Sequence, residues 1–235
     1  MGRFCQIDKY MHKIADNLTQ VKQSIQVAAR AAGRNADQIR LLAVSKTQPA
    51  EVVAQAYAAG QTHFGENYLQ EALGKMAKLE SLPLVWHFIG PLQSNKAALA
   101  AQHFQWVHSV DRLKLAQRLS AARPAHLPPL NICIQVNVDR QATKSGCSVE
   151  GLASLAAAVA KLPNLTLRGL MAIPNPDNSR TAFADLRRLL EDINLMVGLQ
   201  LDTLSMGMSA DLAEAIAEGA TLVRIGTAIF GERNL

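Results

Sequence analysis

A lysine stands at the end of the apolar segment 41–46 (LLAVSK), where its amine could act as a nucleophile. Because side chains alternate along a strand, Lys46 would share a face with Leu42 and Val44. If that face lines a protein interior, burial disfavours the ammonium and favours the neutral amine that forms imines. The alternative is that Lys46 extends from the strand end into solvent. The spacing alone favours neither.

Two segments near the C-terminus have the residue types of a phosphate site. They read SMGMSADLAEA (205–215) and RIGTAIFGE (224–232). Ser209 is predicted to cap a helix, and Gly207 lets a ligand approach the backbone. Gly226 and Thr227 offer backbone N–H groups and a hydroxyl. Each segment alone is typical of a capped helix or a tight turn, whereas the two together favour phosphate binding.

Arg224 interrupts the apolar run TLVRI (221–225) and shares a face with Leu222. An inward guanidinium needs a partner, because an unpaired buried charge is very costly. That partner is either a structural carboxylate or a ligand. Asn67 and His87 stand at comparable strand ends, although a lone histidine in a strand more often has a role in the core. The other histidines show no metal-binding spacing.

Eight short apolar segments alternate with helical patterns, which indicates βα units. The segments are 41–46, 62–65, 84–88, 105–109, 130–136, 165–171, 201–205 and 221–225. The helical stretches are 50–59, 67–80, 93–102, 111–122, 149–161, 179–197 and 209–218, after an amphipathic helix over 7–30. This order predicts an α/β fold, a single (β/α)₈ TIM barrel with an extra N-terminal helix. A doubly wound open sheet is the alternative, but a GxGxxG turn is absent.

Active sites of such barrels lie at the C-terminal ends of the strands. The residues at these predicted ends are unusually polar. They are Lys46, Gly65, Glu66, Asn67, His87 to Gly90, Ser109, Asn137, Met171, Ser205 to Ser209, and Arg224 to Thr227. The candidate nucleophile, the arginine and both phosphate-binding segments are therefore expected at one end of the barrel.

The bulk composition is that of an ordinary soluble domain, with 49% hydrophobic and 18% charged residues. The 235 residues fit one barrel domain spanning 1–235. The net charge of +5 is spread along the chain, which argues against nucleic acid as a partner. Cys5, Cys133 and Cys147 form no CxxC motif and are expected to be reduced thiols. No signal peptide or membrane span is evident, so a cytoplasmic location is expected.

Six segments in order carry a family resemblance. They are AVSKT (43–47), HFGENYLQE (63–71), WHFIGPLQSNK (86–96), GLMAIP (169–174), SMGMSADLAEAI (205–216) and RIGTAIFGER (224–233). From about residue 8 to the C-terminus the chain closely resembles the pyridoxal 5′-phosphate (PLP) homeostasis protein family. The single domain of that family is similar to the N-terminal barrel of bacterial alanine racemase.

The resemblance implies that PLP is the cofactor and that Lys46 holds it as a Schiff base. Arg224 would face the pyridine nitrogen, and the remaining groups would surround the ring and the phosphate. The implied cofactor-binding residues are Lys46, Asn67, Met206, Ser209, Arg224, Gly226 and Thr227. Asn137 would belong to the same rim, with Lys144 and Gly146 in matching positions.

The expected function is that of a non-enzymatic PLP carrier or buffer, acting on amino-acid and keto-acid pools. An arginine at the ring nitrogen makes the ring a weak electron sink. Alanine racemase also has a second domain that supplies a tyrosine base, whereas about ten residues follow 221–225 here. A low-efficiency amino-acid racemase and a PLP-sensing interaction module remain alternatives. A monomer that contacts apo-enzymes transiently is the expected state.

Overall fold

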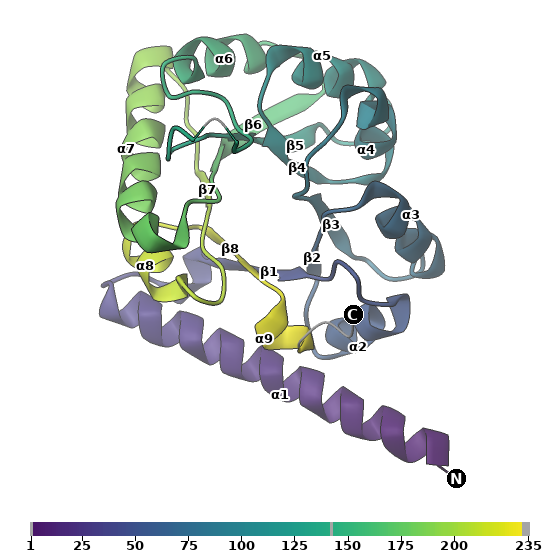
Figure 1. The fold of residues 1–235 in the computed structure, drawn as a ribbon. Helices are drawn as coiled ribbons and strands as arrows, with labels where there is room; N and C mark the ends of the chain where they lie inside the picture. Colours follow the sequence, from purple (N-terminus) through teal and green to yellow (C-terminus); the bar gives the residue numbers. More distant parts are fainter. Residues whose placement is uncertain (1, 142, 232–235) are drawn as a thin grey trace.

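The computed structural model describes residues 2–141 and 143–231, and the side chains from residue 13 onward. Eight parallel strands form a closed barrel in the order of the sequence, with helices around the outside (Figure 1). The strands are β1 Arg40–Val44, β2 His63–Glu66, β3 Val85–Phe88, β4 Trp106–Val110, β5 Leu130–Gln135, β6 Leu165–Met171, β7 Thr203–Ser205 and β8 Leu222–Ile225. The sequence-based prediction of a (β/α)₈ TIM barrel is confirmed.

Helices follow the strands on the outside of the barrel. They are α1 Gly2–Ala31, α2 Ala50–Ala58, α3 Leu69–Lys78, α4 Ala97–His103, α5 Leu113–Ala122, α6 Leu152–Val159, α7 Ser179–Val197, α8 Leu212–Ala217 and α9 Thr227–Phe230. Short 3₁₀ turns occur at η1 Ala36–Gln38, η2 Ser94–Lys96 and η3 Pro176–Asn178. In the part of the chain described, none of these helices combines the length and apolarity needed to cross a membrane.

The pairing of β1 with β8 closes the sheet and rules out the doubly wound alternative. Leu42 pairs with Arg224 across this junction, and Val44 pairs with Gly65 of β2 on the other side of β1. The residues that follow β1, β2 and β8 therefore emerge next to one another. This geometry delivers the loops after these strands to the same end of the barrel.

The N-terminal helix α1 lies across the outside of the barrel, along α2, α8 and α9 (Figure 1). Its inner face is apolar and includes Ile14, Leu18, Val21 and Ile25, which are buried at the predicted spacing of three and four residues. Asn17 Nδ2 donates to the carbonyl of Ile229 in α9 at 2.8 Å. The predicted extra helix is confirmed, and it fixes the last helix to the barrel.

The interior of the barrel holds two small apolar clusters separate from the main core between strands and helices. One contains Leu42, Ile89 and Leu222, with Val44 packed against it. The other contains Trp106, Cys133 and Met171, with Val85 against it. Leu42 and Val44 share a face as predicted, with Leu42 fully buried and Val44 partly buried.

Several predicted helix and strand boundaries were wrong at the C-terminal end of the barrel. The strand 41–46 ends at Val44, because the backbone turns after Ser45. The helix 209–218 begins only at Leu212, and the short helix α9 was missing from the prediction. Helix propensity and apolar spacing do not encode these turns, which long-range backbone hydrogen bonds determine.

The two described cysteine side chains, Cys133 and Cys147, are reduced thiols. Burial raises the pKa of Cys133 to about 12 and that of Cys147 to about 11. Both thiols are therefore poor nucleophiles at neutral pH. The side chain of Cys5 lies outside the described part.

Candidate ligand site at the C-terminal end of the barrel

Lys46 lies in a sharp turn that directly follows β1. The ladder continues to Ser45, whose N–H donates to the Gly65 carbonyl at 3.0 Å. Thr47, the next residue after Lys46, has a left-handed backbone with φ of 66°. Such a conformation is costly for a β-branched residue and persists only where surrounding contacts impose it. Lys46 itself is half-buried.

The contacts that impose this turn come from a buried ion cluster on β2 and α3. Lys75 donates to the Ser45 carbonyl at 2.6 Å and pairs with Glu66 at 2.7 Å and with Glu71 at 2.6 Å. Glu71 also accepts from the Thr47 N–H at 2.6 Å. Lys46 is thus held from both sides of its own backbone.

Glu66 is fully buried at the end of β2 and completes this cluster. Its Oε1 accepts from the Ser45 hydroxyl at 2.6 Å and from Lys75. Burial raises the pKa of Glu66, although the neighbouring Lys75 acts in the opposite direction. Sequence reasoning placed Glu66 at a strand end but gave it no role. The signal was Lys75, a charged residue at a position of α3 where the spacing of Ala72 and Leu79 predicts burial.

Arg224 is buried inside the barrel near the end of β8. Its Nη1 donates to the carbonyl and the hydroxyl of Ser205 at 2.6 and 2.9 Å, and its Nη2 donates to the Ala172 carbonyl at 2.9 Å. No carboxylate of the described residues lies within ion-pair distance of this guanidinium. The structural carboxylate considered from the sequence is therefore not its partner. Burial lowers the pKa of Arg224 to about 10, so it remains a cation at neutral pH.

Asn67 follows β2 at the same end of the barrel. Its side-chain Oδ1 is buried and has no hydrogen-bond partner among the described residues. The backbone of Asn67 is packed against Gly90, where an added Cβ would lie 2.2 Å from the Asn67 carbonyl oxygen. Only glycine permits this approach of the segments that follow β2 and β3. A buried amide oxygen without a partner is uncommon in folded proteins, which makes Asn67 a candidate position for a ligand contact.

The loops after β7 and β8 meet, as the sequence predicted for the two phosphate-type segments. The Arg224 N–H donates to the Gly207 carbonyl at 3.0 Å. Gly207 has φ of 91°, and an added Cβ would lie 2.4 Å from Cβ of Ala215 in α8. Gly226 is half-buried against Val44, and Thr227 is exposed at the start of α9. The backbones of both loops thus lie side by side at the C-terminal end of the barrel.

Two predictions for the loop after β7 need correction or refinement. Ser209 is exposed and is not the helix cap, because Asp211 precedes α8 and accepts from the Met208 N–H at 2.6 Å. Its carboxylate therefore closes the loop that the serine was expected to cap. Met206 is fully buried in the main core, and its backbone N–H donates to the Leu222 carbonyl at 3.1 Å, so its side chain is part of the core packing.

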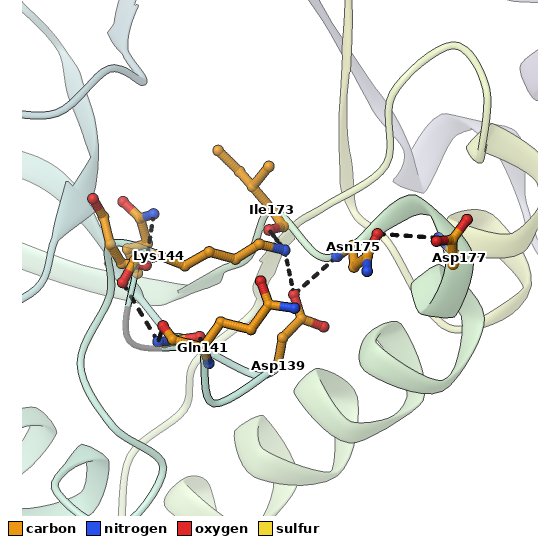
Figure 2. A network of polar contacts seen from close by, with 9 residues as sticks. Asp139, Gln141, Lys144, Ile173, Asn175 and Asp177 are labelled. Atoms are coloured by element: carbon orange, nitrogen blue, oxygen red, sulfur yellow. Dashed lines mark hydrogen bonds and ion pairs between the residues drawn. The ribbon is translucent and has the colours of Figure 1, made fainter.

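The loop after β5 forms the far side of this rim. Figure 2 shows Lys144 extended toward Asp139 and the carbonyl of Ile173. Its Nζ donates to Asp139 Oδ2 at 2.5 Å and to the Ile173 carbonyl at 3.5 Å. Asp139 also accepts from the Asn175 N–H at 2.8 Å, which ties this loop to the segment after β6. Asn137 is used within its own loop, where Nδ2 donates to the Gln141 carbonyl at 2.7 Å.

A cavity of about 220 Å³ lies between these loops. It is bounded by Asn67, Ile89, Pro91, Gln135, Lys144, Ser145 and Ile173. Its lining includes Asn67, whose Oδ1 has no partner among the described residues, and Lys144 of the β5 loop. The C-terminal end of the barrel therefore contains a cavity next to Asn67, one of the site residues predicted from the sequence.

Comparison with known proteins agrees with this arrangement. The family model described as the N-terminal domain of alanine racemase matches residues 17–234. The pyridoxal phosphate homeostasis protein of Pseudomonas aeruginosa is 64% identical over 228 residues, which cover 95% of this chain and 97% of that protein. This chain belongs to the pyridoxal phosphate homeostasis protein family.

Other members of the pyridoxal phosphate homeostasis family are similar over their whole length. The protein of that name from Escherichia coli K12 is 51% identical over 232 residues, covering 95% of this chain and 98% of that protein. The structure of PipY from Synechococcus elongatus with PLP bound has a TM-score of 0.82 and 37% identity, covering 93% of this chain and all of that chain. An alanine racemase of Clostridium difficile, at 14% identity and a TM-score of 0.75, shares the fold over 58% of its length.

Proposed function

We propose that this protein binds PLP at the C-terminal end of its barrel, anchored on Lys46, and that it carries and buffers the cofactor. The observation that carries the proposal is Arg224, a buried cation held by Ser205 and Ala172 with no carboxylate of the described residues in contact. A guanidinium only donates hydrogen bonds, so the ligand atom that meets Arg224 must be an electron-rich acceptor. The names of the relatives and the PLP-bound structure of PipY support the same ligand.

The residues present fit PLP in three respects. Arg224 has donors but no acceptor, and its hydrogen bonds within the described residues use three of five N–H groups. A pyridine nitrogen against it would accept a hydrogen bond and stay unprotonated. Asn67 Oδ1 lacks a partner among the described residues, and Gly207 and Gly226 have no side chain that would keep a phosphate from their backbone.

The chemistry of the anchor suits a carrier. The aldehyde of PLP condenses reversibly with a primary amine, releasing one water, and hydrolysis returns both partners. The protein's part is to hold the backbone of Lys46 through Ser45 and Thr47. Arg224 would donate to the ring nitrogen and keep it unprotonated, which would weaken the ring as an electron sink. These features favour holding the cofactor over transforming a substrate.

The proposal extends to a monomer in the cytoplasm that contacts apo-enzymes transiently, with neither nucleic acid nor membrane as a partner. The dispersed charge and the reduced thiols of Cys133 and Cys147 support this setting. Transfer of PLP to a purified apo-enzyme, measured by recovered enzyme activity, is the expected behaviour. Exchange of the Cα proton of amino acids in D₂O at enzyme-like rates would instead favour a racemase.

Substitution of Lys46 tests the anchor. Borohydride treatment of PLP-loaded protein should give a permanent adduct that mass spectrometry locates at Lys46. Lys46→Ala should remove that adduct, and the far-UV circular dichroism should be unchanged because the ion cluster of Glu66, Glu71 and Lys75 remains. Lys161→Ala, at an exposed lysine remote from the strand ends, is the control and should keep the adduct. An adduct that persists in Lys46→Ala would reject the proposed anchor.

A further inference from the structure

Three histidines from adjacent strands are joined in a row through the barrel interior. His63 Nδ1 lies 2.9 Å from His87 Nε2, and His87 Nδ1 lies 2.9 Å from His108 Nε2. His108 Nδ1 is 2.8 Å from the Ser205 hydroxyl, which accepts from Arg224 Nη1 at 2.9 Å. The row runs from the beginning of β2 to the guanidinium near the end of β8, and the proposed function uses only the guanidinium.

Hydrogen-bond valence fixes the direction of this row. A guanidinium only donates, so Ser205 Oγ must accept from Arg224. The serine has one hydroxyl hydrogen, and its partners among the described residues are Arg224 and His108. A buried hydroxyl hydrogen needs an acceptor, and of these two partners only His108 Nδ1 can accept it. His108 must then carry its proton on Nε2 and donate to His87 Nδ1, and His87 must donate from Nε2 to His63 Nδ1.

The three rings are suited to stay neutral. His87 and His108 are fully buried, and His87 stacks on Trp106 with ring centroids 5.3 Å apart. Burial, together with Arg224, lowers the pKa of His108 to about 3, and burial, together with Arg40, lowers that of His63 to about 4. Burial and the neighbouring histidines lower the pKa of His87 well below its usual value. An arginine near each end thus opposes an imidazolium in the row.

The row is not a metal site. No group of three or more His, Cys, Asp or Glu side chains in the described residues is arranged to hold a metal ion. Both nitrogens of His87 and one nitrogen each of His63 and His108 are instead paired with one another at hydrogen-bond distance. The outermost ring, His63, is half-buried and borders a cavity of about 280 Å³ that is also lined by Lys22 and Ile25 of α1.

We propose that Ser205, His108, His87 and His63 form a one-directional hydrogen-bond relay whose polarity is set by Arg224. The relay directs the hydroxyl hydrogen of Ser205 toward His108, so that the hydroxyl oxygen accepts from Arg224. This contact fixes the orientation in which Arg224 meets its ligand. These are positioning residues, since they act through Arg224. The polarity of the relay is a property of the protein alone, and its effect on PLP rests on the proposed function.

The polarity is measurable without PLP. Long-range ¹H–¹⁵N correlation spectra of the ¹⁵N-labelled full chain report which nitrogen of each histidine is protonated. The expected result is that His63, His87 and His108 are all neutral Nε2–H tautomers between about pH 5 and 8, where an ordinary histidine changes charge. A protonated ring or an Nδ1–H tautomer at any of the three would overturn the proposal, whatever the protein does with PLP.

Two serine variants test the dependence on Arg224. Ser205→Ala removes the hydroxyl that links the guanidinium to His108, so the uniform tautomer pattern should be lost and PLP should bind about three- to tenfold more weakly, the effect of one hydrogen bond. Ser109→Ala is the matched control, since Ser109 is buried beside His108 and its hydroxyl has no partner in the described residues. It should leave the tautomers unchanged. Unchanged tautomers in Ser205→Ala would also overturn the relay. If Ser205→Ala fails to fold, the tautomers in the wild-type spectrum alone test the proposal.

Discussion

The two ends of the barrel treat their polar groups differently. At the N-terminal end, Arg168 pairs with both carboxylate oxygens of Asp202 and lies 5.2 Å from the Trp106 ring centroid. Arg34 donates to two carbonyl groups there, at 2.7 and 2.8 Å. At the C-terminal end, Arg224 has no carboxylate partner and Asn67 Oδ1 has no partner at all among the described residues.

Cavity size points the other way. The N-terminal end contains the larger cavity, about 550 Å³ against about 220 Å³ at the C-terminal end. A site is better identified by polar groups that the fold leaves unsatisfied, because leaving them so costs stability that only a ligand restores. By that criterion Asn67 Oδ1 makes the C-terminal end the better candidate for a ligand site, and the N-terminal contacts are expected to contribute to stability.

The largest expected effect comes from substituting one arginine at each end of the barrel in separate variants. Arg224→Met should weaken PLP binding by about tenfold to hundredfold, the effect of losing a hydrogen bond from a charged group. Arg168→Ala should leave the affinity unchanged because it lies at the opposite end. Absorbance titration with PLP measures both.

Arg224→Lys separates charge from geometry. It keeps the cation but loses the planar fork that contacts Ser205 and Ala172 together, so an intermediate affinity is expected. Equal losses in the Arg168 and Arg224 variants would mean that the two ends do not differ in the way proposed.

A smaller effect is expected from two asparagines. Asn67→Leu should leave the apo-protein as stable or slightly more stable, since it removes an unsatisfied polar atom, and should weaken PLP binding about three- to tenfold. Asn131→Leu, at the N-terminal end, removes hydrogen bonds to Arg168 and Gln105 and should lower stability while preserving affinity. Urea unfolding and PLP titration of both variants check this. A destabilised apo-protein in Asn67→Leu would show that its amide already has a structural partner.

The sequence was sufficient for the barrel and for the strand ends, because apolar periodicity and the order of βα units are local patterns. It brought Arg224, Asn67 and the loops containing Gly207 and Gly226 to one end correctly. It failed on Ser209, because a serine before a helical run satisfies the capping pattern while the competing Asp211 stands two residues later. Asp211 makes no side-chain cap hydrogen bond either, because its carboxylate accepts from the Met208 N–H, a contact that the local pattern does not encode.

The sequence could not have revealed the contacts made across the barrel. The row of His63, His87 and His108 depends on the register of three strands, and a one-residue shift would separate the rings. The cluster around Lys75 likewise joins α3 to the turn after β1, 30 residues away. Both depend on tertiary geometry. The row ends at Arg224 and the cluster holds the turn of Lys46, two residues that the sequence identified without showing what positions them.

The smallest expected effect is the pH dependence of the ion pair at the N-terminal end. Partial burial disfavours the charged form of Asp202, but hydrogen bonds from Arg168 and Thr203 outweigh it and lower its pKa. A pKa that is lower in the folded than in the unfolded state adds stability above the unfolded pKa of about 3.9, and this contribution is lost as the pH falls through the folded pKa. Asp202→Asn should therefore cost at most about 1 kcal/mol at neutral pH, as for other exposed pairs. The cost should shrink toward zero in acid, with PLP affinity at neutral pH unchanged, and urea unfolding across this pH range would contradict the assignment if the cost grew in acid.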